Sequence, residues 1–217
     1  MMIVASAKPD GMFAQAWWIF QDNIPLFWYG IKITLLLAVC GTLIGLLIGL
    51  LLGGIRAVRI EERDAPVSRI IKKILHGFVG LYVWIFRGTP MMVQLMIMCY
   101  VVFGKYNVSK LIVTTLAFGI NSGAYVAEIV RSGIMSIDPG QLEAGRSLGF
   151  SYSQTMWHII MPQTFKNVLP ALANEFIVLL KETSVCGYIG MMDLTRGGDI
   201  IRSRTYEPFM PLIGVAL

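Results

Sequence analysis

The sequence predicts an all-α integral membrane protein with about five membrane-spanning helices. Of the 217 residues, 56% are hydrophobic and 14% are charged, whereas soluble domains average about 45–50% apolar and about 25% charged residues. The mean hydropathy is +0.68, and long uncharged runs alternate with short polar segments, as expected of spans and their loops. The net charge of +5 is spread over these loops and forms no continuous basic stripe, so nucleic acid is not an expected partner.

The N-terminal segment lacks the pattern of a signal peptide, which has a basic start, an apolar core and a small-residue cleavage site. Instead, Phe13, Trp17, Trp18 and Phe20 lie near Asp22. Tryptophan is enriched at the membrane–water interface, so this segment predicts a short amphipathic helix in the headgroup region.

The first span is expected over residues 33–55, a run without charge. At 1.5 Å per residue, this run is long enough to cross the hydrocarbon core with a little tilt. Every fourth residue in part of the run is glycine: Gly41, Gly45, Gly49 and Gly53. Glycines at this spacing share one helix face and predict a close-packed seam, either within the subunit or between subunits.

The polar residues 56–73 include six basic side chains and are expected to form a cytoplasmic loop, which places the N-terminus outside. The next apolar run, 74–103, is interrupted by Arg87-Gly88-Thr89-Pro90 and is expected to be one long, kinked second span. A short external turn at 104–110 then leads to a third span at 111–134.

The polar residues 135–162 return the chain to the cytoplasmic side, and a fourth span is expected from 168 to 192. Residues 193–207 would form a second external loop, although its arginines go against the positive-inside tendency. These arginines are Arg196, Arg202 and Arg204. A fifth span would begin at Pro208, and because ten residues cannot cross a bilayer, the chain is expected to end inside that helix.

The loop 138–162 predicts two short, capped helices. Asp138-Pro139-Gly140-Gln141 combines an acidic N-cap, a proline at the first helical position and a glutamine three residues after the cap. Gly149 occupies the place of a left-handed C-cap glycine, and Ser151 with Gln154 predicts a second capping box. The second helix is expected to end near Ile160, with Pro162 opening the next segment. By capping alone, this is a helical hairpin on the cytoplasmic face.

This loop resembles the EAA loop of ABC-importer permeases. That pattern reads Glu-Ala-Ala, three residues, glycine, nine residues and Ile-x-Leu-Pro. Five positions agree: Glu143, Ala144, Gly149, Ile159 and Pro162. Gly145 replaces the second alanine, which lowers helix propensity by about 1 kcal/mol, and Met161 replaces the leucine.

Other segments resemble the polar amino acid branch of the same family, over roughly residues 25–217. They are Phe86-Arg87-Gly88-Thr89-Pro90, Gly123-Ala124-Tyr125-Val126-Ala127-Glu128-Ile129-Val130-Arg131, Gly140-Gln141-Leu142-Glu143-Ala144, Asn174-Glu175-Phe176 and Leu180-Lys181-Glu182-Thr183-Ser184. The resemblance implies the type I importer permease fold, as a single transmembrane permease domain over residues 1–217 in a bacterial cytoplasmic (inner) membrane.

The resemblance also implies the partners. Two permease subunits, identical or paralogous, would pair with an ABC ATPase homodimer, and an extracytoplasmic amino acid-binding protein would deliver a small polar amino acid. ATP and Mg would bind the ATPase, because this sequence has no G-x-x-x-x-G-K-[ST] phosphate loop and needs no cofactor of its own. The expected ATPase-docking residues are Glu143, Ala144, Gly145, Arg146, Ser147, Leu148 and Gly149.

A polar amino acid carries an ammonium and a carboxylate, and polar groups inside spans default to functional or paired roles. Glu175 is the acid expected to meet an ammonium or guanidinium group. The expected substrate-pathway residues are Asn121, Ser122, Tyr125, Asn174 and Glu175. Glu128 and Arg131 lie three residues apart, and the alternative for this pair is a simple ion pair near the cytoplasmic end.

Two other classes remain as alternatives. In a secondary, ion-coupled transporter or channel subunit, the intramembrane charges would bind coupling ions, and internal inverted repeats would favour it. A small integral-membrane enzyme would need catalytic or metal residues gathered at one depth. The cysteines and histidines are scattered and match no metal spacing: Cys40, Cys99, Cys186, His76 and His158.

Overall fold

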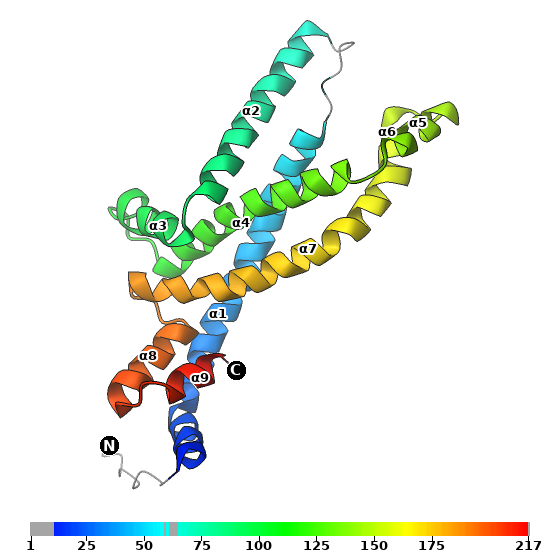
Figure 1. Ribbon diagram of the computed structural model, residues 1–217. Helices are drawn as coiled ribbons and strands as arrows, with labels where there is room; N and C mark the ends of the chain where they lie inside the picture. The colour runs from blue at the N-terminus through cyan, green and yellow to red at the C-terminus, as the bar shows by residue number, and fades with distance from the viewer. Residues whose placement is uncertain (1–10, 59, 61–64, 217) are drawn as a thin grey trace. The chain divides into compact units, whose positions relative to one another are not determined.

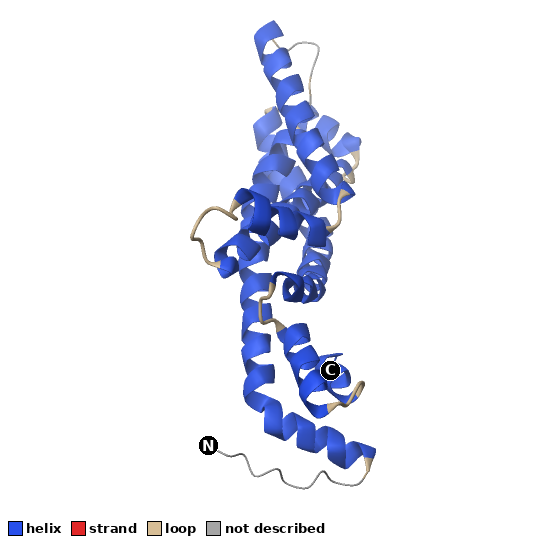
Figure 2. Cartoon of the chain, turned by 90° about the vertical axis from the view of Figure 1, so that its left-hand side faces the viewer, coloured by secondary structure: helices blue, strands red, loops and turns tan. Residues whose placement is uncertain are grey.

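The computed structural model describes residues 11–58, 60 and 65–216. These residues form helices joined by turns and contain no strand, which confirms the all-α class (Figure 2). Their contacts divide the chain into two compact units, Ala38–Lys181 and Met1–Leu37 with Glu182–Leu217, and each unit is described by itself. The assignment of the whole chain to a single domain stays a prediction.

The first helix, α1, runs without interruption over Met12–Ala57. The short N-terminal helix that the sequence predicts is continuous with the first span, because the apolar sequence runs through Pro25 without a capping break. Its place in the headgroup region stays a prediction. Proline removes a backbone donor and distorts a helix, and Figure 2 shows α1 changing direction in its N-terminal part. The side chain of Phe13 lies outside the described residues, as do Arg59 and Arg63 of the expected cytoplasmic loop.

The second span is more sharply broken than the sequence predicts. Helix α2 covers Pro66–Gly88, α3 covers Met91–Met96 and the π-helix η1 covers Ile97–Val102. The axes before and after the break differ by 105°, so this is a right-angle turn in place of the expected kink. The expected loop 56–73 is also too long, because its last eight residues form the first two turns of α2.

Side chains attach α2 to both of its neighbours in the unit Ala38–Lys181. Nε2 of His76 lies 2.9 Å from the carbonyl oxygen of Ile55 in α1. The hydroxyl of Tyr82 donates to the carbonyl of Ile120 in α4, the helix over Lys110–Met135. His76, which matched no metal motif, thus serves as a contact between helices.

Helix α4 covers Lys110–Met135, within one residue of the expected third span at each end. About half of its residues are buried, and the glycine face of α1 packs directly on it. A Cβ atom built on Gly49 would lie 2.4 Å from Cβ of Val126, and one built on Gly53 would lie 2.8 Å from Cβ of Val130. The seam predicted from the glycine spacing is therefore confirmed, and its place is within the subunit.

The packing between α1 and α4 is reciprocal, because α4 offers glycines to large side chains of α1. A Cβ on Gly119 would lie 2.4 Å from Cγ2 of Ile44, and one on Gly123 would lie 2.8 Å from Cγ2 of Ile48. Each backbone thus approaches the other where the opposite helix has no side chain.

After α4 the chain forms the expected hairpin and the fourth long helix. The bounds are α5 Pro139–Ser147, α6 Tyr152–Thr155, η2 Met156–Ile160, α7 Met161–Glu182 and η3 Thr183–Ile189. No turn separates α6, η2 and α7, so the expected break at Pro162 was wrong. Proline is tolerated in the first turn of an α-helix, which is where Pro162 lies. Figure 1 shows α5 and α6 at the end of α4, where α7 begins.

By length and apolar composition, two described helices are able to cross a membrane, α1 from Ala14 and α4. A third is added if α2 and α3–η1 count as one broken span. The total of about five spans stays a prediction, since α7 carries polar side chains and the last described helix is short.

The unit formed by Met1–Leu37 and Glu182–Leu217 adds α8, Leu194–Thr205, and α9, Met210–Ala216. Ile19 and Phe27 of α1 and Ile201 of α8 form its buried core. The expected external loop 193–207 is thus mostly helical, because Asp193 caps α8 by accepting from the amides of Thr195 and Arg196 at 3.0 and 3.2 Å.

The carboxyl of Asp193, which caps α8, is fully buried. Burial raises the pKa of the Asp193 carboxyl, although the hydrogen bonds from the α8 amides lower it. The amide of Leu194 donates to Thr34 Oγ1 at 3.3 Å. A Cβ on Gly30 would lie 2.7 Å from Cα of Leu194, so α1 and the start of α8 also meet at a glycine.

The Gly49→Ala variant tests the seam, with Gly54→Ala as its matched control on the same helix. The new methyl at residue 49 overlaps Val126, and overpacking of this kind costs about 1–3 kcal/mol. Nothing lies within 4 Å of a Cβ at Gly54, so that variant gains up to about 1 kcal/mol of helix propensity. Thermal unfolding in detergent should give a lower Tm for Gly49→Ala only. Equal Tm values for the two variants would contradict the seam.

Candidate functional site

In the hairpin 138–162, local hydrogen bonds hold the first helix, α5, at both of its ends. Asp138 caps α5 by accepting from the amide of Gly140 at 2.7 Å, so the cap forms on Gly140 and not on Gln141 as the expected box would require. At the other end, Gly149 has a φ of +86°, as predicted for a left-handed C-cap glycine. Its amide donates to the carbonyl of Arg146, and that of Phe150 donates to the carbonyl of Gly145. These two bonds make a Schellman motif and fix the turn.

The second capping box forms as predicted. The amide of Gln154 donates to Oγ of Ser151 at 3.3 Å, and the amide of Ser151 donates to Oε1 of Gln154 at 2.9 Å. This reciprocal pair satisfies two donors at the start of α6.

The two arms of the hairpin touch at Gly145. This glycine is buried, and a Cβ on it would lie 2.5 Å from Cγ2 of Thr155 and 3.2 Å from Cδ1 of Ile159. Thr155 is itself fully buried and donates to the carbonyl of Ser151 at 3.1 Å. The space that an alanine methyl would fill at residue 145 is therefore taken by Thr155, which explains the glycine and makes the hairpin compact.

The rest of the predicted docking segment faces outward. Apart from Gly145, the residues of 143–149 are exposed, and the side chain of Leu148 is 76% exposed. Trp157 on η2 is 70% exposed. Arg146 and Trp157 are both exposed on this stiff hairpin, and arginine and aromatic residues are the types enriched in surfaces that bind another protein.

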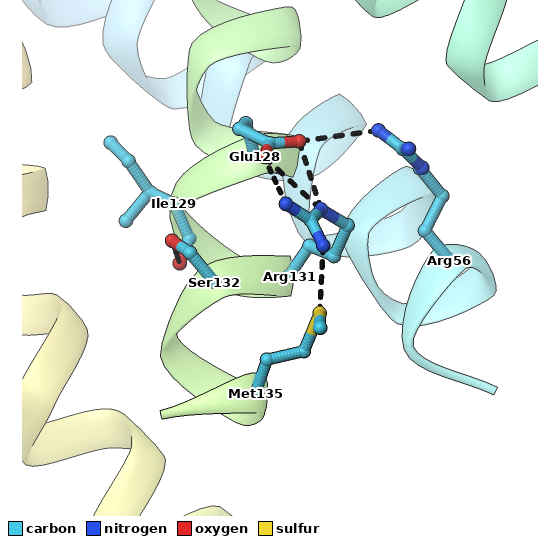
Figure 3. Close-up of polar contacts among 6 residues, drawn as sticks. All are labelled: Arg56, Glu128, Ile129, Arg131, Ser132 and Met135. Atoms are coloured by element: carbon cyan, nitrogen blue, oxygen red, sulfur yellow. Dashed lines mark hydrogen bonds and ion pairs between the residues drawn. The ribbon is translucent and has the colours of Figure 1, made fainter. Parts of the chain in front are cut away.

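An ion cluster ties the end of α1 to α4 (Figure 3). Glu128 receives hydrogen bonds from Nε and Nη2 of Arg131, which confirms the alternative that these two residues pair. Arg56, which the sequence reasoning did not assign, donates to the same carboxylate at 3.2 Å. Two guanidinium groups share one acid, so the cluster keeps a net positive charge at the end of the glycine seam.

A second polar contact lies inside the unit, between α4 and α7. Oγ of Ser122 donates to Oε1 of Glu175 at 2.9 Å, with Ser122 fully buried and Glu175 only 7% exposed. A Cβ on Gly45 would lie 2.7 Å from both Cβ and Oγ of Ser122. The glycine seam therefore holds Ser122 in place toward the acid.

The remaining predicted pathway residues have different neighbours. Asn121 is buried and donates to Oε1 of Gln94 at 2.8 Å and to the carbonyl of Phe86 at 3.2 Å. The guanidinium of Arg87 lies 5.3 Å from the ring centroid of Tyr125, a cation–π contact. Asn174 is exposed. Of the five residues, Ser122 and Glu175 bond directly to each other. Asn121 bonds instead to Phe86 and Gln94, on either side of the break before α3.

Gln94 and Arg87 are the residues that the sequence reasoning missed. The amide of Gln94 donates to Oγ1 and the carbonyl of Thr89 and to the carbonyl of Phe86, and so holds the right-angle turn. Arg87 contacts the ring of Tyr125. The signal was present, since Arg87-Gly88-Thr89-Pro90 stood out in the sequence as a charged break in an apolar run. Among the described residues, no group of three or more His, Cys, Asp or Glu is placed to hold a metal ion.

Comparisons with known proteins agree on one family. Residues 45–217 match the model of the family described as binding-protein-dependent transport system inner membrane component. The putative glutamine transport system permease protein GlnP of Rickettsia prowazekii is 39% identical over 145 residues, 65% of this chain and 66% of that protein. The arginine transport system permease protein ArtQ of Bacillus subtilis is 36% identical over 196 residues, 88% of this chain and 83% of that protein.

A solved structure is similar over nearly the whole chain. A crystal structure of an amino acid ABC transporter with histidines contains a chain that is 41% identical, with a TM-score of 0.79. The match covers 91% of this chain and 87% of that chain.

The contact between Gly145 and Thr155 predicts a non-additive pair of substitutions. Gly145→Ala places a methyl against Thr155 and should speed amide hydrogen exchange in α5 about tenfold, which corresponds to about 1.4 kcal/mol of overpacking. Thr155→Ala in the same chain frees that space and should return exchange close to the wild-type rate. Additive effects of the two changes would contradict the packing described here.

Proposed function

The chain belongs to the family of binding-protein-dependent transport system inner membrane components, and on that premise we propose that it works as the membrane subunit of an ATP-driven importer for a polar amino acid. Its fold is the type I ABC-importer permease fold. The observation that carries the proposal is the capped, exposed hairpin 138–162, joined without a break to the helix that holds the buried acid Glu175.

The hairpin is suited to dock an ATPase. Its caps and the contact of Gly145 with Thr155 make it a stiff arm, and the exposed Glu143 offers a carboxylate to a basic group or helix end on the partner. ATP and Mg belong to that partner, because this sequence has no phosphate-binding loop of its own. The partners of the complete importer are an ABC ATPase homodimer, a second permease subunit, identical or paralogous, and an extracytoplasmic binding protein.

The polar groups within the spans fit the two charges of an amino acid. Glu175 supplies a carboxylate for an ammonium or guanidinium group, and Ser122 orients that carboxylate through its hydrogen bond. Arg87, held against Tyr125, supplies a positive charge for the carboxylate of the same amino acid. The relatives whose names specify glutamine or arginine transport support this substrate class.

The proposed orientation rests on the six basic residues of 56–73, which favour the cytoplasmic side for the segment after α1. The hairpin is proposed to face the same side, and the N-terminus and residues 193–207 the outside, although the arginines of 193–207 go against the positive-inside tendency. Movement of the ATPases against the hairpin would then change access to Glu175 across the inner membrane.

ATPase activity of the reconstituted complex tests this function. The chain, its ATPase and its binding protein are combined with a panel of amino acids, and one polar amino acid should stimulate hydrolysis. Glu143→Ala should abolish this stimulation, whereas Gln141→Ala, an exposed change outside the docking segment, should leave it unchanged. Failure of the chain to assemble with any ATPase would refute the proposal.

Glu175→Gln separates the substrate acid from the docking surface. The amide keeps the shape and the capacity to accept from Ser122, but it loses the charge that attracts an ammonium. The complex should assemble and keep its basal ATPase rate, while uptake of the amino acid falls at least about tenfold, as expected when a charged partner is left without its counter-charge. Unchanged uptake and unchanged stimulation would exclude Glu175 from the substrate site.

A further inference from the structure

A polar cavity lies within the unit formed by Met1–Leu37 and Glu182–Leu217, between the N-terminal part of α1 and the end of α8. Its volume is about 380 Å³, which falls in the range of about 300–1,000 Å³ that is typical of small-molecule sites. We call it the α1–α8 cavity. Polar side chains line it together with two apolar ones: Asp22, Asn23, Arg204, Glu207, Trp18 and Ile19. The buried acid Glu175 belongs to the other unit and is not part of this lining.

Core packing brings the α1 side of the lining to the end of α8. Ile19 of α1 packs with Ile201 of α8 in the buried core of this unit. Asp22 and Asn23 follow Ile19 within about one helical turn and therefore lie beside the last turn of α8. The side-chain amide of Asn23 donates to the carbonyl of Ile19 at 2.9 Å. This bond fixes the Asn23 side chain and does not use its amide oxygen, which is an acceptor.

A strained turn forms the other side of the lining. Among the described residues, Tyr206 is the one non-glycine residue with a positive φ, at 56°, a conformation that is unfavourable for L side chains and that is often kept at binding sites. The amide of Glu207 donates to Oγ1 of Thr205 at 3.4 Å across this turn. The turn thus brings an acid, Glu207, into the same lining as the base Arg204.

Asp22 and Arg204 give the cavity charges of both signs. Both line it, yet within the part of the chain that the structure describes they form no ion pair with each other or with a third residue. The nearby Asp199 pairs with Arg202 at 3.2 Å and so does not neutralise Arg204. Opposite charges that line one cavity without pairing are complementary to a molecule that carries both charges itself.

We propose that the α1–α8 cavity binds a small zwitterion, with its primary ammonium on Asp22 and its anionic group on Arg204. A guanidinium binds carboxylate and phosphate alike through paired N–H donors, and the amide oxygen of Asn23 is a further acceptor for the ammonium. A free amino acid and the headgroup of phosphatidylethanolamine both have this chemistry. The inference goes beyond the importer function, because it adds a second site that does not depend on Glu175.

Direct binding to the whole chain tests this site. The chain carries Glu175→Gln to remove the acid of the proposed substrate site, and it is held in nanodiscs of phosphatidylcholine, whose ammonium has no N–H donor. Labelled glutamine and arginine are the probes. Asp22→Asn and Arg204→Gln should each weaken binding about fivefold at low salt, a modest loss because both side chains are exposed. Asp199→Asn and Arg202→Gln, the same changes outside the lining, should leave binding unchanged.

Modified probes test the orientation of the bound molecule. N-acetylation removes the ammonium of an amino acid, and amidation removes its carboxylate. Asp22→Asn should bind the free and the N-acetylated amino acid alike and still discriminate against the amidated one. Arg204→Gln should show the reverse pattern. Pairing each substitution with each modification forms a double-mutant cycle between protein and ligand, and a general loss of folding would not produce opposite selectivities. The same loss of discrimination in both variants would contradict the assignment.

A lipid arm distinguishes the two sources. The wild-type chain and its variants are taken from nanodiscs with equal phosphatidylethanolamine and phosphatidylcholine, and native mass spectrometry measures the retained lipid. If the headgroup is the ligand, the wild-type chain should retain phosphatidylethanolamine selectively and Asp22→Asn should not. Amino acid binding that is absent or insensitive to Asp22→Asn and Arg204→Gln, together with no lipid selectivity, would overturn the proposal. That result would leave the importer function intact, since uptake by the complete complex is measured separately.

Discussion

The close contact between α1 and α4 is the constraint on which the arrangement of the unit Ala38–Lys181 depends. Inside a bilayer there is little hydrophobic driving force between helices, so the association of two membrane-spanning helices relies on close packing and polar contacts. Glycines on one helix face large side chains on the other in both directions, as at Gly49 with Val126 and at Gly119 with Ile44. A side chain at either glycine would need the opposing atoms to shift.

The polar contacts of the unit are placed by that seam. Near its middle, Gly45 makes room for Ser122, which holds the buried carboxylate of Glu175. At its end, Gly53 packs on Val130, and Glu128 and Arg131 of the same helix bind Arg56. Packing brings the helices close enough for short hydrogen bonds, and the bonds satisfy charges that would be costly in a low-dielectric environment.

The other face of α4 packs on α7, which continues into the hairpin. A Cβ on Gly133 would overlap Val168, and Asn167 donates to Ser136 at 3.1 Å. Because residues 152–182 form helix without an intervening turn, force on the hairpin acts on the helix that carries Glu175.

Local chemistry explains what the sequence could predict. Periodicity and short spacings can be read from a single sequence. They predicted the third span, the Ser151–Gln154 box, the Gly149 turn and the glycine seam. The right-angle break before α3 depends on Gln94 reaching Thr89 and Phe86, and the choice of glycine at residue 145 depends on Thr155. Such contacts arise only when the chain is folded.

Helix α8 was missed because its charges suggested a loop, whereas its buried face is set by Gly197, Gly198 and Ile201.

Uptake of the stimulating amino acid into proteoliposomes that hold the complete complex tests the central claim most directly. Binding protein is supplied outside, and ATP is either enclosed or left out, with and without an imposed ion gradient. Uptake should require enclosed ATP and binding protein, and it should persist when ionophores remove every gradient. Uptake driven by an ion gradient in the absence of ATP would contradict it and would make this chain part of a secondary transporter.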